Sequence, residues 1–178
     1  MWPSDSTSTK SIGHFFLLVR RPAVIIFAER DQRRKSRRRS KVSEHINPRC
    51  EPEIVFVMGR DLSGDQVTAT DVLAATAGVA VGIEVLDSRY TDYRFTMPDV
   101  VADNASAGRY VVGTPVAPDG IDLRLVGVVL EHNGDVVATA SGAASLGHPA
   151  AAVAWLVRSL AGSGEGLRAG DVVLSGGL

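Results

Sequence analysis

Three glutamates stand out because their spacing could hold a metal ion. Glu51 and Glu53 flank Pro52 just before the apolar run 54–58, and Glu84 lies inside a second apolar run, 79–86. Alternate residues of an extended strand point to the same face, so we expect Glu51 and Glu53 to stand side by side. Two carboxylates so close repel each other, and one tends to stay protonated unless a cation lies between them.

Glu84 also needs a positive charge nearby, because it lies within an apolar strand. An ionised carboxylate in so apolar a strand is costly unless it is paired or bound to metal. One interpretation is a structural ion pair with Arg89, five residues further along. The other is a cage of three carboxylates around one ion. Oxygen ligands alone favour Mg²⁺ or Mn²⁺, with water or substrate completing an octahedral set.

The elements that must position these acids follow from apolar patterning and turn residues. A capping box formed by Thr68 and Asp71 predicts a short helix over 72–76, and the pair Asn133-Gly134 predicts a β-hairpin. Predicted strands cover 54–58, 79–86, 123–130, 136–139 and a last run from 171 to 174. Predicted helices cover 149–160 and a turn within 98–107. We therefore predict an α+β, strand-dominated fold with a few short helices.

Composition separates the chain into two unequal parts. The 178 residues are 45% hydrophobic and 22% charged, with a single cysteine, which suits a globular domain and excludes a disulfide framework. Residues 1–50 carry a charge balance of +8, whereas residues 51–178 carry −9. We therefore divide the chain into a basic, atypical segment, 1–47, expected to be disordered or foreign, and a globular domain, 48–178.

The leading segment gives little support to a nucleic-acid or membrane role. Its basic run, 30–41, is interpreted either as a nucleic-acid arm or as a solvated disordered stretch. No aromatic residue is interleaved with these bases, so we predict no nucleic-acid partner. The apolar runs 15–19 and 23–28 fall short of the roughly 20 residues of a membrane span. With no credible targeting segment, a cytoplasmic protein is expected.

From Pro48 onward the chain resembles the fumarylacetoacetate hydrolase superfamily, in the branch of 2-keto-4-pentenoate hydratases and 2-oxo-3-hexenedioate (4-oxalocrotonate) decarboxylases. The resemblance rests on five blocks in order: PRCEPEIVFVMGRDL (48–62), GIEVLDSRY (82–90), DVVADNASAGRYVVG (99–113), LRLVGVVLEHNGDVVATASGAASLGHPAAAVAWL (123–156) and LRAGDVVLSGGL (167–178). It implies a distorted β-barrel-like core of the fumarylacetoacetate hydrolase C-terminal type.

The resemblance also implies roles for particular residues. The family's E-x-E block and its third glutamate match Glu51, Glu53 and Glu84, as ligands of Mg²⁺ or Mn²⁺. Asp103 and Ser106 match polar residues near the family's substrate, where they would hold water or move protons. The residues by themselves leave a plainer alternative open, in which Asp103 caps a helix and Ser106 bonds only to backbone.

The implied activity is a metal-dependent hydratase in the meta-cleavage breakdown of aromatic compounds. It would add water to 2-hydroxypenta-2,4-dienoate (2-keto-4-pentenoate) to give 4-hydroxy-2-oxopentanoate. One alternative is a 4-oxalocrotonate decarboxylase acting on 2-oxo-3-hexenedioate. Expected partners are a small 2-oxo or 2-hydroxydienoic acid and either a second copy of the chain or a sibling pathway enzyme.

The chain also departs from the family pattern. Relatives carry a lysine in a KIGLTS-like segment before the E-x-E block, and nothing in the 50 residues before Glu51 matches it. The family also continues beyond LSGGL through further strands. We therefore expect a fragment truncated at both ends, which makes a non-catalytic family member the remaining alternative.

Overall fold

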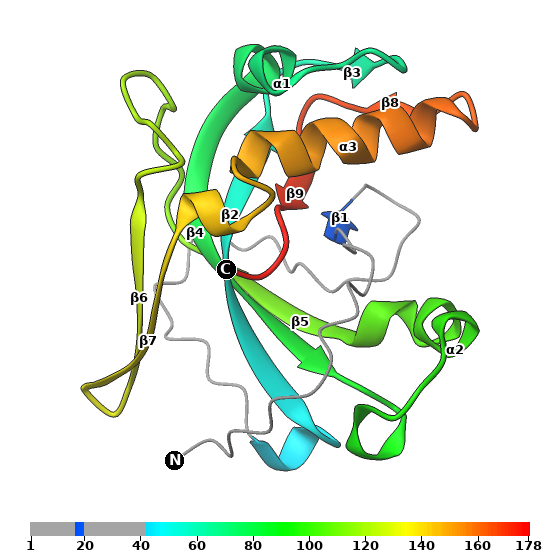
Figure 1. Cartoon of the computed structure of the whole chain (residues 1–178), viewed down its shortest axis with the longest axis vertical. Coiled ribbons are helices and arrows are strands. Elements are labelled where there is room, and N and C mark those ends of the chain that lie inside the picture. Colours follow the sequence, from blue (N-terminus) through cyan, green and yellow to red (C-terminus); the bar gives the residue numbers. More distant parts are fainter. Residues whose placement is uncertain (1–16, 20–41) are drawn as a thin grey trace.

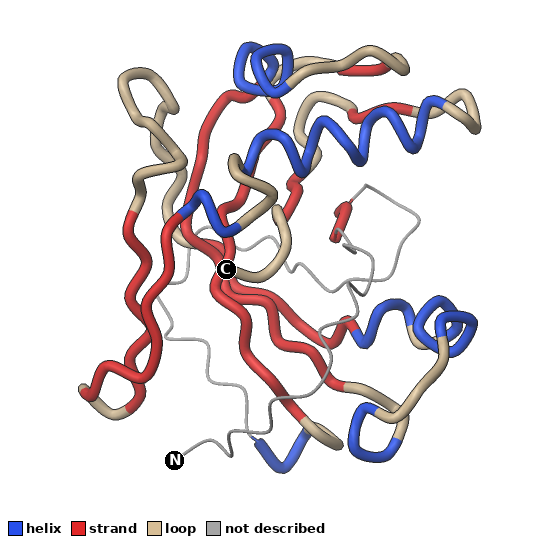
Figure 2. The backbone as a smooth tube through the Cα atoms, in the orientation of Figure 1, coloured by secondary structure: helices blue, strands red, loops and turns tan. Residues whose placement is uncertain are grey.

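The computed structural model describes residues 17–19 and 42–178 of the chain. Within them the main sheet has five antiparallel strands in the order β1-β9-β2-β4-β5 and is strongly curled (Figures 1 and 2). Its strands are β1 (Leu17–Val19), β9 (Val172–Leu174), β2 (Pro48–Met58), β4 (Thr76–Asp87) and β5 (Ala107–Val112). The strand-dominated fold predicted from the sequence is confirmed.

The long pair β2–β4 forms the centre of the sheet. Its register runs from Pro48 opposite Asp87 to Met58 opposite Thr76. The predicted strands 54–58 and 79–86 both lie within this pair, but each is longer than the apolar pattern indicates. Backbone pairing continues past the apolar residues because ladder hydrogen bonds do not depend on side-chain polarity. This extension brings the acidic residues of β2 into the sheet.

Two helices cover one face of β2. They are α1 (Ala69–Ala75), which begins at the predicted capping box of Thr68 and Asp71, and α3 (Pro149–Ala161), as predicted. In Figure 1 they lie together at one end of the curved sheet. Their buried residues pack with alternate residues of β2, and this core includes Ile54, Phe56, Met58, Val72, Val153 and Val157. The opposite face of β2 is therefore left to carry Glu51 and Glu53.

The predicted hairpin is present as β6 (Gly127–His132) and β7 (Asp135–Ser141). Asn133 and Gly134 form its turn with φ values of 55° and 94°, the left-handed conformation that an Asn-Gly pair adopts at low cost. The prediction that this strand begins at 123 was wrong. The segment before β6 instead turns at Asp122, whose carbonyl accepts a hydrogen bond from the Leu125 N–H.

The remaining elements are short. They are α2 (Met97–Ala102), which overlaps the predicted turn region 98–107, and the two-stranded sheet of β3 (Leu62–Ser63) and β8 (Gly166–Leu167). Short 3₁₀ turns lie at Val42–Glu44, Thr91–Tyr93, Asn104–Ser106 and Gly142–Ala144. None of the helices in the described part of the chain is long and apolar enough to cross a membrane.

Parts of the leading segment belong to the folded domain. Residues 17–19 form β1, which pairs with β9. Ile46 and Asn47 donate their N–H groups to the Asp87 carboxylate, at 2.9 and 2.8 Å. The domain therefore includes residues before the boundary at Pro48 that the composition suggests. The predictions made for 1–16 and for the basic run 30–41 lie outside the described residues.

Gly142 is a position where a side chain has no room. A Cβ there would lie 1.8 Å from the Leu123 carbonyl oxygen, a backbone atom that cannot move aside alone. We expect Gly142→Ala to lower the free energy of unfolding by about 1–3 kcal/mol, the usual cost of overpacking. Urea unfolding measures the effect. Gly127→Ala is the control, because a Cβ at Gly127 meets nothing within 4 Å, and equal losses in both variants would contradict the prediction.

Candidate metal centre

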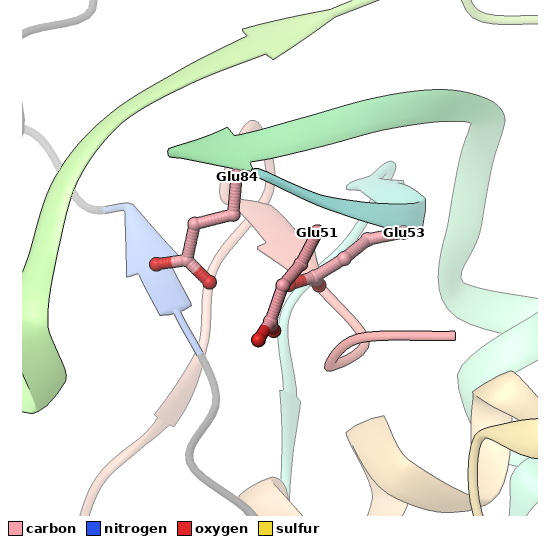
Figure 3. A group of neighbouring side chains, drawn as sticks. All are labelled: Glu51, Glu53 and Glu84. Atoms are coloured by element: carbon pink, nitrogen blue, oxygen red, sulfur yellow. The ribbon is translucent and has the colours of Figure 1, made fainter. Parts of the chain in front are cut away.

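The three predicted glutamates converge on one face of the β2–β4 pair. Glu51 lies directly opposite Glu84 in the register, and Glu53 follows two residues along β2 on the same face. One carboxylate oxygen from each residue lies within 4.8 Å of the other two. Figure 3 shows the three carboxyl groups pointing into the same space. The expected juxtaposition of Glu51 and Glu53 is therefore present, and Glu84 joins them, which is the arrangement of the three-carboxylate interpretation.

Glycines on the neighbouring segments pack closely against β2 around the acidic cluster. Gly82 lies opposite Glu53, and a Cβ there would come 2.5 Å from Cγ2 of Val55. Gly177 packs against Glu51, since a Cβ at Gly177 would lie 2.5 Å from Oε2 of that carboxylate. Gly176, with φ 91°, donates its N–H to Oε2 of Glu53 at 2.7 Å. The segment after β9 therefore closes one side of the acidic cluster.

Burial makes the three carboxyl groups hold protons more tightly than usual. Glu53 is 1% exposed, and desolvation together with the charge of Glu84 raises its pKa to about 9. Desolvation also raises the pKa of Glu84, although a hydrogen bond with Glu53 opposes the rise. Burial raises the pKa of Glu51 in the same way, and the charge of Arg49 opposes it. Without a cation the cluster therefore stays partly protonated near neutral pH.

The cluster fits a hard divalent cation. Around Mg²⁺, ligand oxygens at about 2.1 Å lie about 3.0 Å apart when adjacent and about 4.2 Å apart when opposite. The glutamate oxygens lie within 4.8 Å of one another, so they would have to move closer together to occupy three positions of such an octahedron. The donor set is entirely carboxylate oxygen, the set that Mg²⁺ and Mn²⁺ prefer.

The alternative in which Arg89 pairs with Glu84 was wrong. The Arg89 guanidinium makes its ion pair with Asp103, through Nε and Oδ1. It also donates to the backbone carbonyls of Asp87 and Ala107, at 3.0 and 3.1 Å. Arg89 lies past the point where β4 ends, so its side chain is directed to the segment between α2 and β5. Glu84 is therefore left to the acidic cluster.

Asp103 and Ser106 lie together in a buried network away from the strand centre. Asp103 accepts hydrogen bonds from the hydroxyls of Ser88 at 3.1 Å and Ser106 at 2.8 Å. Asp103 is 4% exposed and Ser106 is 3% exposed. Burial alone would raise the pKa of Asp103, but the hydrogen bonds from Ser106, Arg89 and Ser88 outweigh it and lower the pKa. These contacts position the turn that follows β4, and a catalytic role for either residue stays a prediction.

Two further residues share the face of the acidic cluster without having been picked out from the sequence. Tyr110, on β5, lies directly opposite Glu84 in the register. Arg49 lies two residues before Glu51, and its guanidinium stacks 3.8 Å over the centroid of the Tyr93 ring. Alternation along β2 could have indicated Arg49, but its aromatic partner comes from a turn more than forty residues later.

A cavity of about 480 Å³ adjoins the cluster. Its walls come from Cys50, Glu51 and Pro52 of β2, from the hairpin β6–β7, and from Gly177 and Leu178. The hairpin contributes mainly aliphatic side chains, among them Val128, Leu130 and Val137. The volume is of the size that a small organic molecule requires.

The raised carboxyl pKa values predict a pH-dependent response to Mg²⁺. The pKa of Glu53 is about 9 in the folded chain, above its ordinary value, so the folded state holds a proton that the unfolded state releases. Stability of the metal-free protein should therefore fall as the pH rises from about 5 towards 9. A bound cation replaces that proton, so the stabilisation by Mg²⁺ should grow over the same range.

Thermal unfolding at pH 6.0 and pH 8.5, each with Mg²⁺ and with EDTA, measures this response. We expect a clearly larger rise of Tm on adding Mg²⁺ at the higher pH. In Glu53→Gln, which carries no titrating carboxyl there, the pH dependence of the metal-free protein should flatten. A stabilisation by Mg²⁺ that is equal or smaller at pH 8.5 would contradict the prediction.

The sequence is similar to one known protein family and to enzymes of two kinds. The family model for the fumarylacetoacetate (FAA) hydrolase C-terminal domain matches residues 16–178. A 2-keto-4-pentenoate hydratase of Paraburkholderia xenovorans (strain LB400) is 48% identical over 132 residues, covering 74% of this chain and 49% of the relative. A 4-oxalocrotonate decarboxylase of Pseudomonas sp. (strain CF600) is 46% identical over 137 residues, covering 76% of this chain and 52% of the relative.

A solved structure shows the same architecture. It is the 4-oxalocrotonate decarboxylase from Pseudomonas putida G7 in complex with magnesium and adipate, with a TM-score of 0.74 and 43% identity over 77% of this chain and 52% of that one. The chain thus spans about half the length of the curated relatives it matches.

Proposed function

The chain belongs to the fumarylacetoacetate hydrolase C-terminal family, and from this premise we propose that Glu51, Glu53 and Glu84 bind one Mg²⁺ or Mn²⁺ ion. The convergence of these three carboxylates on one face of the β2–β4 pair is the observation that carries the proposal. Support also comes from the magnesium complex of the decarboxylase relative, which is 43% identical to this chain.

We further propose that the protein is a hydratase that adds water to 2-hydroxypenta-2,4-dienoate to give 4-hydroxy-2-oxopentanoate. Relatives 45–48% identical over about three quarters of the chain are named as hydratases of 2-keto-4-pentenoate or 2-hydroxyhexa-2,4-dienoate. The cavity beside Glu51 provides room for a small acid of this kind.

Different residues of the chain would have different roles in such a site. A bound divalent ion would supply electrophilic stabilisation of the negative charge that develops on the substrate oxygens. Glu51, Glu53 and Glu84 would hold that ion, and the Gly176 N–H fixes the orientation of the Glu53 carboxylate. The aliphatic wall of the hairpin would exclude water from the carbon chain of the substrate.

The hydratase proposal is tested by the ultraviolet absorbance of the dienoate. Purified protein with Mg²⁺ or Mn²⁺ should consume 2-hydroxypenta-2,4-dienoate, and EDTA should abolish the loss of absorbance. The product should be identified as 4-hydroxy-2-oxopentanoate, because ketonisation of the dienol alone also changes the spectrum. Absence of metal-dependent turnover would refute hydratase activity for this chain.

Decarboxylation of 2-oxo-3-hexenedioate is the second candidate. It is supported by the decarboxylase relatives, which are 41–46% identical to this chain. Release of carbon dioxide from that substrate separates the two reactions, since the hydratase reaction releases none.

A further inference from the structure

Arg49 lies beside the acidic cluster and on the same face of β2. It precedes Glu51 by two residues and lies opposite Leu86 in the register of β2 and β4. Side chains two residues apart on a strand begin about 6.6–7 Å from each other on one face. The Arg49 side chain therefore starts from the same face of β2 as Glu51, one of the residues that we propose as ligands.

The guanidinium of Arg49 is held by an aromatic turn. It lies 3.8 Å from the centroid of the Tyr93 ring, within the range of a cation–π interaction. Two contacts hold Tyr93 in its turn. Its hydroxyl donates a hydrogen bond to the Asn47 carbonyl at 2.9 Å, and the centroid of its ring lies 6.1 Å from the centroid of the Phe95 ring. The positive group is thus positioned before any ligand arrives.

The charge of Arg49 is available to a ligand. Arg49 is exposed, and none of the ion pairs found among the described residues includes it. The guanidinium can donate hydrogen bonds to a planar anion, and no ion pair with a carboxylate of the described residues has to break first.

Charge balance shows why an anionic substrate needs such a group. Three ionised glutamates around one divalent cation leave a net charge of −1, which repels a carboxylate. The +1 charge of Arg49 cancels this excess at the edge of the site. A guanidinium also matches a carboxylate through two parallel hydrogen bonds, whereas an ammonium group does not.

We propose that Arg49, oriented by Tyr93, binds the carboxylate of the 2-oxo acid substrate. This inference rests on the proposed function and assigns the substrate-binding group of the same site. It predicts that removing the guanidinium weakens binding of a 2-oxo acid but not binding of the metal.

The test measures two affinities by calorimetry, that of the protein for Mg²⁺ and that of the Mg²⁺-loaded protein for 2-oxopentanoate. For Arg49→Gln we expect acid binding about 10- to 100-fold weaker, the usual loss for a hydrogen-bonded charged pair. Mg²⁺ affinity should stay within about threefold or rise slightly, because a like charge is removed. Arg49→Lys, which keeps the charge but not the planar fork, should fall between wild type and Arg49→Gln.

Two controls make the result specific. Arg60→Gln removes an exposed arginine beyond the other end of β2 and should change neither affinity. Tyr93→Leu should weaken acid binding in the wild-type background but not in Arg49→Gln, because the ring acts through the guanidinium.

The outcomes separate failure of this inference from failure of the proposed function. Acid binding by Arg49→Gln within twofold of wild type overturns the role of Arg49. A parallel fall in Mg²⁺ affinity also overturns it, because the residue would then act on the metal site. If wild-type protein binds Mg²⁺ but not 2-oxopentanoate, the proposed substrate class fails and this inference fails with it. If wild type does not bind Mg²⁺, the metal centre itself is refuted.

Discussion

Replacing Glu53 by glutamine is expected to weaken Mg²⁺ binding by at least about 100-fold. Glu53 is the most deeply buried member of the cluster, at 1% exposed, and its carboxylate is fixed by the Gly176 N–H. Glutamine keeps the shape but removes one of three negative charges. Changes to groups that only support a ligand already cost 10- to 100-fold in affinity, so loss of a ligand charge should cost more.

Calorimetric titration with Mg²⁺, and with Mn²⁺ followed by electron paramagnetic resonance, measures this loss. Glu131→Gln is the matched control, because Glu131 is an exposed glutamate on the hairpin strand β6. We expect Glu53→Gln to remain folded and, without metal, to be at least as stable as wild type at pH 8.5, since folding no longer requires residue 53 to take up a proton. Unchanged Mg²⁺ affinity in Glu53→Gln would remove the basis of the proposed function.

The second large effect is expected at Asp103, where Asp103→Ala should lower the free energy of unfolding by about 3–4 kcal/mol. The substitution leaves two hydroxyls, Ser88 Oγ and Ser106 Oγ, without their shared acceptor and breaks the ion pair to Arg89. Breaking a buried ion pair costs about 3–5 kcal/mol, and we take the lower part of that range because the Arg89 side chain is 43% exposed.

The backbone beside Asp103 adds to the expected loss. Asn104, Ala105 and Ser106 have φ values of 50°, 53° and 60°, a left-handed conformation that costs about 1 kcal/mol or more per residue outside glycine. The hydrogen bond from Ser106 to Asp103 helps to hold this segment in place. Without this hydrogen bond, nothing in the pair of Ser106 and Asp103 offsets the cost of the left-handed backbone conformation.

Urea unfolding of Asp103→Ala, with the exposed Asp119→Ala as control, measures the effect. A loss below 1 kcal/mol would show that the network does not stabilise the fold. Because the pKa of Asp103 is lowered, its contribution is present above the unfolded value of about 3.9 and disappears as the pH falls below it. Ser106→Ala separates a structural from a catalytic role, since lost turnover at unchanged stability would support the latter.

Local patterns predicted much of this structure. The capping box at Thr68, the Asn133-Gly134 turn and the helix 149–160 depend on residues close in sequence, and each is present. That Glu51 and Glu53 lie side by side also followed from a local rule, the alternation of side chains along a strand, whereas the position of Glu84 beside them depends on the register of β2 and β4.

The rest depended on contacts that no local pattern contains. The partner of Arg89 is set by the path of the chain between α2 and β5, which places Asp103 beside the end of β4. The orientation of Glu53 depends on Gly176, which is 123 residues away in the sequence. The position of Arg49 over Tyr93 depends on a turn that follows the neighbouring strand. Such pairings are fixed by the register of β2 and β4 and by the packing around it.

The long separation between Glu53 and its backbone donor also bears on the order of assembly during synthesis. Met58 and Thr76 are close in sequence, so the β2–β4 ladder can close early and bring Glu51, Glu53 and Glu84 together. Gly176 emerges from the ribosome only after α3 and β9 have been made. If the ladder closes at that stage, the three acids lie side by side before the segment that carries Gly176 has been made, and protons or a solvent cation would have to neutralise them during that interval.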